Sequence, residues 1–215
     1  MRAKALGYGV VLMLVIASIV MQMSLPASDG SRFATIVLQA VTLLAAVWAA
    51  DVRGGTRVAA LVAVVIVIAS LITWVIRGDL PAAPAAIVNG LLVAVAPVAI
   101  ARALLRDLRE QHQVTTATLA GVLAIYLLAG MFFSFLYGVI GAIDANSLFA
   151  QVEHSDREDQ LYFSFVTLCT VGYGDLTPDG GLPRTISVAE MLVGQIYLVT
   201  IVSLIVSNLG AVRRR

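Results

Sequence analysis

Long apolar runs are the feature that most restricts what this chain can fold into. Six runs follow one another, with short polar segments between the first five and a longer segment before the last, and they cover residues 5–23, 34–50, 58–76, 85–105, 117–143 and 183–209. A helix needs about 20 apolar residues to cross a bilayer, and in lipid it satisfies its own backbone hydrogen bonds. Only 13% of the residues are charged, about half the fraction found in soluble domains. The sequence therefore predicts an all-α integral membrane protein with six transmembrane helices.

The first run also fits a second interpretation, a cleaved signal peptide, because it follows the basic residues Arg2 and Lys4. Cleavage before Ser28 would place Ala27 and Leu25 at the positions where small residues are typical. Leu25 is too large for that pattern. We therefore expect the first helix to be retained.

A shorter helix is predicted between the fifth and sixth runs. Ser155 and Glu158 have the Ser-x-x-Glu spacing of a capping box, which marks the start of a helix. The helix would occupy residues 156–169 and would be too short to span a bilayer. We expect it to be re-entrant, because such a helix is tolerated at membrane depth when it is buried in protein or lines water.

The six residues that follow this helix, 170–175, read T-V-G-Y-G-D. Gly172 and Gly174 can adopt the positive φ angles that other residues avoid. In alternation with Val171 and Tyr173, they can turn successive carbonyls toward one axis, where the oxygens would replace the water around a cation. A Gly-rich turn between two helices is the alternative. The stretch resembles the selectivity filter of potassium channels.

The resemblance extends to the order of the surrounding elements. Residues 114–215 contain a helix, a short helix, the filter and an inner helix at 183–209, which is similar to the two-helix pore module of potassium channels. Residues 1–113 would form a four-helix transmembrane domain in the position of a voltage sensor. One chain supplies one filter loop, whereas a closed ring of carbonyls needs several. The resemblance therefore implies a homotetramer, since identical subunits ordinarily build an axis by closed cyclic assembly.

The resemblance assigns ion binding to the filter itself. The residues expected to form the ion path are Thr170, Val171, Gly172, Tyr173, Gly174 and Asp175. The first four would bind K⁺ through their carbonyls, Gly174 would let the chain turn, and Asp175 would be outermost. K⁺ enters as the permeant ion, and no other cofactor is expected.

Neighbouring residues are expected to support the filter or to take part in gating. Tyr162 and Phe163 occupy the place of an aromatic pair that holds the filter open in many family members, with ordinary helix packing as the alternative. Thr167 and Cys169 are also expected to support the filter. Gly194 and Glu190 are expected to take part in gating. An inner cavity is expected to be lined by Thr200, Ser203 and Ser207. The last three share one helix face, which fits contacts between helices equally well. For Glu190, the alternative to a role in gating is a hydrogen bond behind the filter.

The basic residues predict the orientation. If both termini are cytoplasmic, ten of the 14 Lys and Arg residues lie inside and four lie outside, as the positive-inside rule requires. The filter then enters from the external face. We expect a multi-pass protein of the plasma membrane, with a bacterial inner membrane favoured and the lipid bilayer and K⁺ as partners. The net charge of +1 argues against a nucleic-acid partner.

Strong voltage gating is not expected. The fourth run carries Arg102, Arg106 and Arg109 only at its inner end, and each charge that crosses the field contributes about 2.3 kcal/mol per 100 mV. The sequence thus predicts a potassium-selective channel that conducts K⁺ passively. A weakly selective cation channel and, from a different class, a subunit of a pore-loop ion transporter are the alternatives. No enzyme is expected, because no catalytic cluster shares a membrane depth.

Overall fold

The computed structural model describes residues 2–26, 28–50, 55–111, 115–143 and 148–212. These residues form helices and contain no strand, apart from isolated bridges that Phe149 makes with Val152 and Pro178. The helices are α1 (Arg2–Ser24), α2 (Asp29–Ala49), α3 (Gly55–Arg77), α4 (Ala82–Gln111), α5 (Thr116–Ile143), α6 (Arg157–Leu168) and α7 (Gly181–Val212). The predicted all-α class is confirmed for the described part of the chain.

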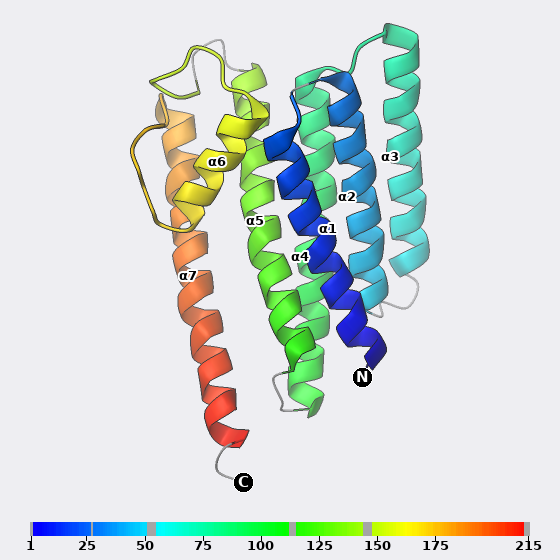
Figure 1. Cartoon of the computed structure of the whole chain (residues 1–215), viewed down its shortest axis with the longest axis vertical. Helices are drawn as coiled ribbons and strands as arrows, with labels where there is room; N and C mark the ends of the chain where they lie inside the picture. The colour runs from blue at the N-terminus through cyan, green and yellow to red at the C-terminus, as the bar shows by residue number, and fades with distance from the viewer. Residues whose placement is uncertain (1, 27, 51–54, 112–114, 144–147, 213–215) are drawn as a thin grey trace.

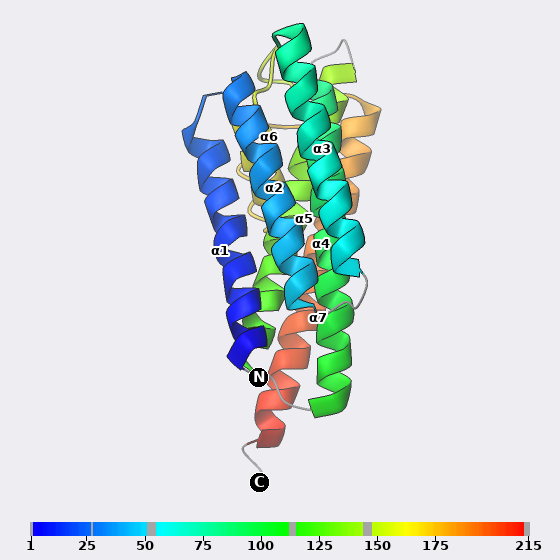
Figure 2. The same ribbon diagram turned by 90° about the vertical axis from the view of Figure 1, so that its right-hand side faces the viewer.

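The long helices run alternately up and down, so that α1 begins and α7 ends at the same end of the molecule (Figure 1). Helices α1 to α5 form a bundle, with α3 at the edge farthest from α7 (Figures 1 and 2). The short α6 slants between α5 and α7 in the half of the molecule away from the chain ends. This arrangement places α6 where the sequence predicts a short helix between the last two long ones.

Within the described residues, five helices are long and apolar enough to cross a membrane: α1, α2, α4, α5 and α7. In α3 the described apolar segment, Leu61–Arg77, is shorter. By length and composition, the protein is therefore an all-helical, multi-pass membrane protein.

Capping residues set the starts of two helices. Ser28 caps α2, because its hydroxyl accepts a hydrogen bond from the backbone N–H of Ser31 at 3.2 Å. The capping box predicted at Ser155 for α6 is wrong by one residue. The N-cap is Asp156, whose backbone N–H donates to the Asp159 carboxylate at 3.1 Å, while the Ser155 carbonyl accepts from the side-chain amide of Gln160.

The predicted limits of two helices also shift. Residues 156–169 were expected in the short helix, whereas α6 extends over Arg157–Leu168 with Cys169 as its C-cap. The last helix begins at Gly181, two residues before the predicted start at Pro183. Proline fits inside the first turn because the N–H groups there have no helical acceptor.

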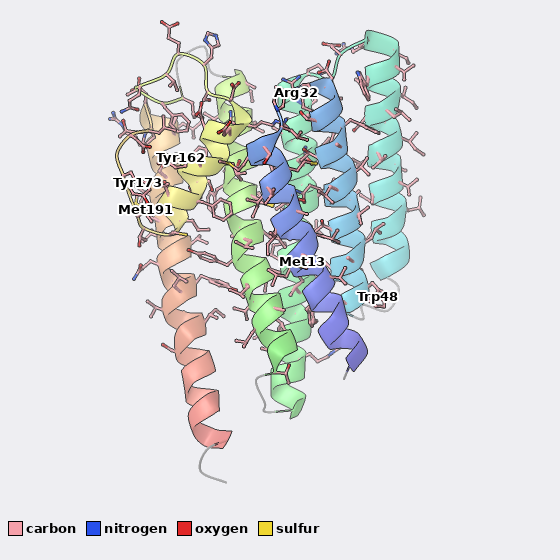
Figure 3. The ribbon with its side chains drawn as sticks, in the orientation of Figure 1. Met13, Arg32, Trp48, Tyr162, Tyr173 and Met191 are labelled. Carbon is pink, nitrogen blue, oxygen red and sulfur yellow. The ribbon has the colours of Figure 1, made fainter. Side chains whose placement is uncertain are left out.

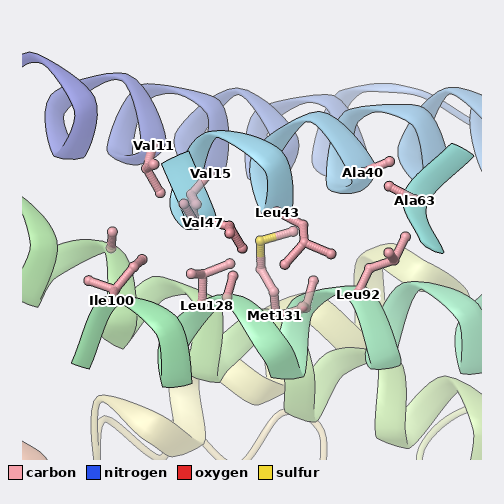
Figure 4. Packing of buried hydrophobic residues seen from close by; sticks show 14 of the residues in the cluster. Val11, Val15, Ala40, Leu43, Val47, Ala63, Leu92, Ile100, Leu128 and Met131 are labelled. Carbon is pink, nitrogen blue, oxygen red and sulfur yellow. The ribbon is translucent and has the colours of Figure 1, made fainter. Parts of the chain in front are cut away.

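The main apolar core lies between α1, α2, α4 and α5, with a contribution from α3 (Figure 4). Leu43 of α2, Leu92 of α4 and Leu128 of α5 are buried in it. Helices α1 and α2 approach closely at Gly7, where an added Cβ would lie 2.8 Å from the Cβ of Ala49. Small residues that permit such approaches favour helix association in lipid, where packing rather than water exclusion drives the contact.

Helices α1 and α4 pack against α5 of the same chain, and α1 also contacts α6. Helix α7 contacts only α5 and α6 among the described elements. The N-terminal helices therefore pack on the C-terminal part of their own chain mainly through α1 and α4.

Candidate functional site

The backbone of residues 170–174 alternates between two conformations. Thr170, Gly172 and Gly174 have φ angles of 58°, 60° and 78°, whereas Val171 and Tyr173 do not have positive φ. Around both glycines an added Cβ would meet no atom within 4 Å. Backbone conformation, and not lack of space, therefore favours glycine at these two positions.

Thr170 has a conformation that sequence reasoning did not anticipate. It is the one non-glycine residue with positive φ in the described part of the chain. A β-branched residue rarely adopts this region, and the strain typically costs about 1–3 kcal/mol. Thr170 extends the alternation of the two glycines by one more step toward α6.

Hydrogen bonds to the end of α6 orient the first part of this segment. The backbone N–H groups of Val171 and Gly172 both donate to the Val166 carbonyl, at 2.9 and 3.4 Å. In a trans peptide the C=O points opposite to the N–H of the next residue. The carbonyls of Thr170 and Val171 therefore both point away from α6, toward the exposed side of the segment. The C-terminal end of α6, which carries roughly half a negative charge, lies behind them.

The C-terminal end of the segment is fixed by Tyr162. Its hydroxyl donates to the Asp175 carboxylate at 2.6 Å, and the backbone N–H of Leu176 donates to the other oxygen of that carboxylate. The hydrogen bond from Tyr162 lowers the pKa of Asp175, and the N–H of Leu176 acts in the same direction. Figure 3 shows Tyr162 and Tyr173 on the side of the molecule away from α1 to α4.

The two members of the predicted aromatic pair point to different surroundings. Tyr162 reaches Asp175, whereas Phe163 is buried against the rings of Tyr137 and Phe149, with centroids 5.2 and 4.8 Å away. Phe163 therefore packs α6 on α5 and on the loop before α6.

The other predicted support residues lie at the C-terminal end of α6. Thr167 is buried, and its carbonyl accepts from the N–H of Thr170 at 3.0 Å. Cys169 is exposed, and its sulfur lies 3.5 Å from the Tyr126 hydroxyl. Tyr126 also donates to the Leu168 carbonyl at 3.1 Å.

Glu190 of α7 is fully buried behind α6. Its carboxyl group lies within hydrogen-bonding distance of the Ser164 hydroxyl on α6 and of the Tyr137 hydroxyl on α5. Tyr137 also contacts the Ser187 hydroxyl at 3.1 Å. One acid thus connects the three helices around residues 170–175.

Gly194 lies where α7 meets the end of α6. A Cβ on this residue would come within 2.3 Å of the Leu168 carbonyl oxygen, a distance that real structures do not show. The close approach of two backbones is therefore a sufficient reason for glycine here.

The residues predicted to line an inner cavity lie in the half of α7 beyond Gly194. Thr200 and Ser203 are exposed, and the Ser203 hydroxyl donates to the Val199 carbonyl of its own helix at 2.6 Å. The side chain of Ser207 lies outside the described residues.

The start of α6 is anchored to the N-terminal helices. The Arg157 guanidinium donates to the hydroxyls of Ser31 at 2.6 Å and Thr35 at 3.3 Å, both on α2. Burial lowers the pKa of Arg157, and the positive charge of Arg32 acts in the same direction. Arg157 lines a cavity of about 210 Å³ that also touches α1, α4 and α5.

Sequence reasoning missed four residues that hold this region together: Tyr126, Tyr137, Ser164 and Tyr197. Tyr197 of α7 donates to the Val122 carbonyl of α5 at 2.6 Å. The available signal was a hydroxyl group inside an apolar run, because a polar group at membrane depth needs a partner. The identity of each partner depends on packing between helices.

A comparison with protein families bears on this C-terminal half. The family described as "Ion channel" matches residues 121–210, from α5 to near the end of α7. The Two-pore potassium channel 2 of Arabidopsis thaliana is 53% identical over 36 residues, which are 17% of this chain and 8% of that protein. Most of the plant channel thus has no counterpart in the matched region.

Two bacterial proteins, both called Protein LctB, also match. The protein from Bacillus caldotenax is 35% identical over 99 residues, 43% of this chain and 72% of the relative. The protein from Geobacillus stearothermophilus is 52% identical over 46 residues, 21% of this chain and 34% of the relative. Since the match covers most of the first LctB protein, and the family match spans α5 to α7, this chain belongs to the ion channel family.

Proposed function

We propose that the protein is a potassium-selective channel that conducts K⁺ passively across the plasma membrane. The observation that carries this proposal is the backbone of residues 170–174, where left-handed conformations alternate with ordinary ones. Val166 accepts two successive N–H groups, so that the carbonyls of Thr170 and Val171 point the same way. Carbonyl oxygens in such a row replace the hydration shell of a potassium ion.

The same exposed segment supports a homotetramer. Tyr173 is 70% exposed and Val171 is 49% exposed in the single chain. Both follow closely after the end of α6, where Leu168 is buried. Four copies around one axis would bring their filter segments together and enclose the ion path. The assembly would place residues 114–215 of each copy at the centre and residues 1–113 around them. In this arrangement α1 to α5 and α7 make six spans, with both chain ends cytoplasmic.

The name of the plant relative, a potassium channel, supports K⁺ as the permeant ion, and the bacterial organisms of the LctB relatives support a bacterial source. Weak voltage dependence is part of the proposal. Arg102 and Arg106 are exposed near the end of α4, while the side chain of Arg109 lies outside the described residues. Among the described residues no ion pair joins these arginines to an acid on α1 to α3.

Recording from purified protein in a planar bilayer with asymmetric K⁺ and Na⁺ tests the proposal. The current should reverse near the potassium equilibrium potential. Equal permeability to both ions would support the alternative, a weakly selective cation channel. A complementary measurement by native mass spectrometry should find four copies of the chain, and a conducting monomer would contradict the assembly.

Two glycines offer a matched pair of variants for the same recordings. Gly172 and Gly78 have positive φ angles of 60° and 74°, and neither has an atom within 4 Å of an added Cβ. Gly172→Ala should abolish the selective current while the tetramer remains, because the altered backbone lies in the ion path. Gly78→Ala carries the same backbone strain at the end of α3 and should leave selectivity unchanged.

A further inference from the structure

The buried carboxyl group of Glu190 lies at the centre of a chain of oxygen atoms that crosses three helices. On one side it meets the Ser164 hydroxyl, which also lies 2.7 Å from the Gly130 carbonyl of α5. On the other side it meets the Tyr137 hydroxyl at 2.7 Å. Beyond Tyr137, the Ser187 hydroxyl lies 2.9 Å from the Pro183 carbonyl.

Four of these oxygen pairs are no more than 2.9 Å apart, and each needs one hydrogen between its atoms. They are Gly130–Ser164, Ser164–Glu190, Glu190–Tyr137 and Ser187–Pro183. The fifth pair, Tyr137–Ser187, is longer at 3.1 Å. A carbonyl only accepts, and a hydroxyl donates one hydrogen. The three hydroxyls of Ser164, Tyr137 and Ser187 therefore supply three hydrogens for four short contacts.

The missing hydrogen belongs between Ser164 and Glu190. Ser164 donates its single hydrogen to the Gly130 carbonyl, because that oxygen carries no hydrogen of its own. Tyr137 donates to one carboxyl oxygen of Glu190 in the same way. An ionised Glu190 would then face the Ser164 oxygen with no hydrogen between them.

We propose that Glu190 is a neutral acid whose proton lies on Oε1 and is donated to the Ser164 hydroxyl. In this form every short contact holds one hydrogen, and Glu190 donates to α6 while it accepts from α5. The position of the proton rests on the geometry alone. The role that follows, holding the inner helix against the helix that carries the filter, rests on the proposed function.

The surroundings of Glu190 fit a neutral group. None of the described Lys or Arg side chains forms an ion pair with it. The titratable groups that face it are Tyr137 and, farther along α5, Tyr126; Ser164 on α6 and Ser187 on α7 are uncharged. A buried carboxylate without a cation is strongly disfavoured, whereas a neutral acid with both hydrogen bonds satisfied is tolerated. We assign Glu190 as a positioning residue.

Infrared spectroscopy of the full-length protein in lipid at neutral pH tests the proton directly. A protonated carboxyl group has a C=O stretch that is separate from the bands of ionised carboxylates and that shifts in deuterium oxide. Glu190→Gln should remove one such band. The matched control, Glu158→Gln, changes an exposed acid at the start of α6 and should leave the band in place. Loss of a carboxylate band in Glu190→Gln would overturn the proposal.

A second variant keeps the acid and covers the case in which Glu190→Gln fails to assemble. Ser164→Ala removes the acceptor of the proposed proton, so the acid band should shift to higher frequency rather than vanish. An unchanged band would show that the proton is not donated to Ser164. Neither infrared measurement depends on ion current. Both can therefore be interpreted even if the channel proves not to be selective for potassium.

Recordings then test the positioning role. A Gln amide donates to Ser164 and accepts from Tyr137, as the neutral acid does. We therefore expect Glu190→Gln to conduct like the unchanged protein and Glu190→Ala to lose conduction. If Glu190→Gln also loses conduction while its tetramer is intact, the neutral hydrogen-bonding role is contradicted.

Discussion

Helices α1 to α5 and helix α7 are held in place by different means. The first five share one apolar core in which Leu43, Leu92 and Leu128 are buried. Helix α7 contacts only α5 and α6 among the described elements, through the Glu190 hydrogen bonds, the Tyr197 hydroxyl and the close approach at Gly194. Much of its surface is apolar and exposed, including Leu192 at 57% and Ile196 at 63%.

The difference teaches that α1 to α5 pack around one shared core, whereas α7 is attached to its own chain through two helices alone among the described elements. The exposed face of α7 and the exposed filter segment adjoin the ion path that we propose. Four copies would cover part of this surface, and lipid would cover the rest. Variants that affect one mode of attachment and not the other can test this comparison.

The largest effect on conduction is expected from Gly194→Ala, at the contact between α7 and α6. The added Cβ would lie 2.3 Å from a backbone oxygen of Leu168, and a backbone cannot rotate away as a side chain can. Overpacking typically costs about 1–3 kcal/mol and occasionally more. We expect conduction to be lost and the tetramer to dissociate at lower temperature, as measured by bilayer recording and by gel filtration after heating.

Gly181→Ala is the control for that variant, because it lies on the same helix and an added Cβ there would meet no atom within 4 Å. It should conduct normally. If Gly194→Ala also conducts normally, the close contact between α7 and α6 does not exist in the working channel.

A substitution in the core of α1 to α5 should lower the stability of that part of the molecule. Leu92 is 2% exposed in the core of the first five helices, whereas Leu192 of α7 is 57% exposed. Leu92→Ala should lower the free energy of unfolding by about 2–5 kcal/mol, because it leaves a cavity. Leu192→Ala should lower it much less. Unfolding in mixed detergent micelles, followed by circular dichroism, gives both values, and equal losses would contradict the contrast between the two regions.

The smallest effect is expected at the outer end of the proposed filter. The hydrogen bond from Tyr162 lowers the pKa of Asp175, so that the carboxylate stays charged to lower pH than an ordinary aspartate. Tyr162→Phe removes this donor and should raise the pKa of Asp175. The decline of inward current on external acidification should therefore begin at higher pH in the variant. Identical pH profiles would show that the bond does not form in the conducting channel.

Sequence reasoning succeeded where a short stretch of chain determines the structure. The apolar runs predicted the long helices, and Gly172 and Gly174 predicted positive φ because glycine adopts it without strain. Thr170 was missed, since its conformation is unfavourable for a β-branched residue and arises from its surroundings. At the start of α6, Ser155 and Asp156 both have an acid three residues later, and sequence spacing could not distinguish the two capping boxes.

Contacts between distant residues could not be predicted. Glu190 was a candidate because an acid inside a membrane helix needs a partner. Its partners, Ser164 and Tyr137, lie 26 and 53 residues away in the sequence. A single sequence does not contain the crossing geometry of α5, α6 and α7 that brings these groups together. The same holds for Gly194, where the nearby backbone oxygen, and not the glycine alone, explains the residue.

The hydrogen bonds from Arg157 to Ser31 and Thr35 have a consequence for engineering this protein. They make the C-terminal half dependent on hydroxyl groups that the N-terminal half supplies, across 126 and 122 residues of sequence. A chimera that joined α5 to α7 onto foreign helices would leave a half-buried guanidinium without these acceptors. Transplanting the conducting half would therefore require two hydroxyls at matching positions of the new host, or a neutral residue in place of Arg157.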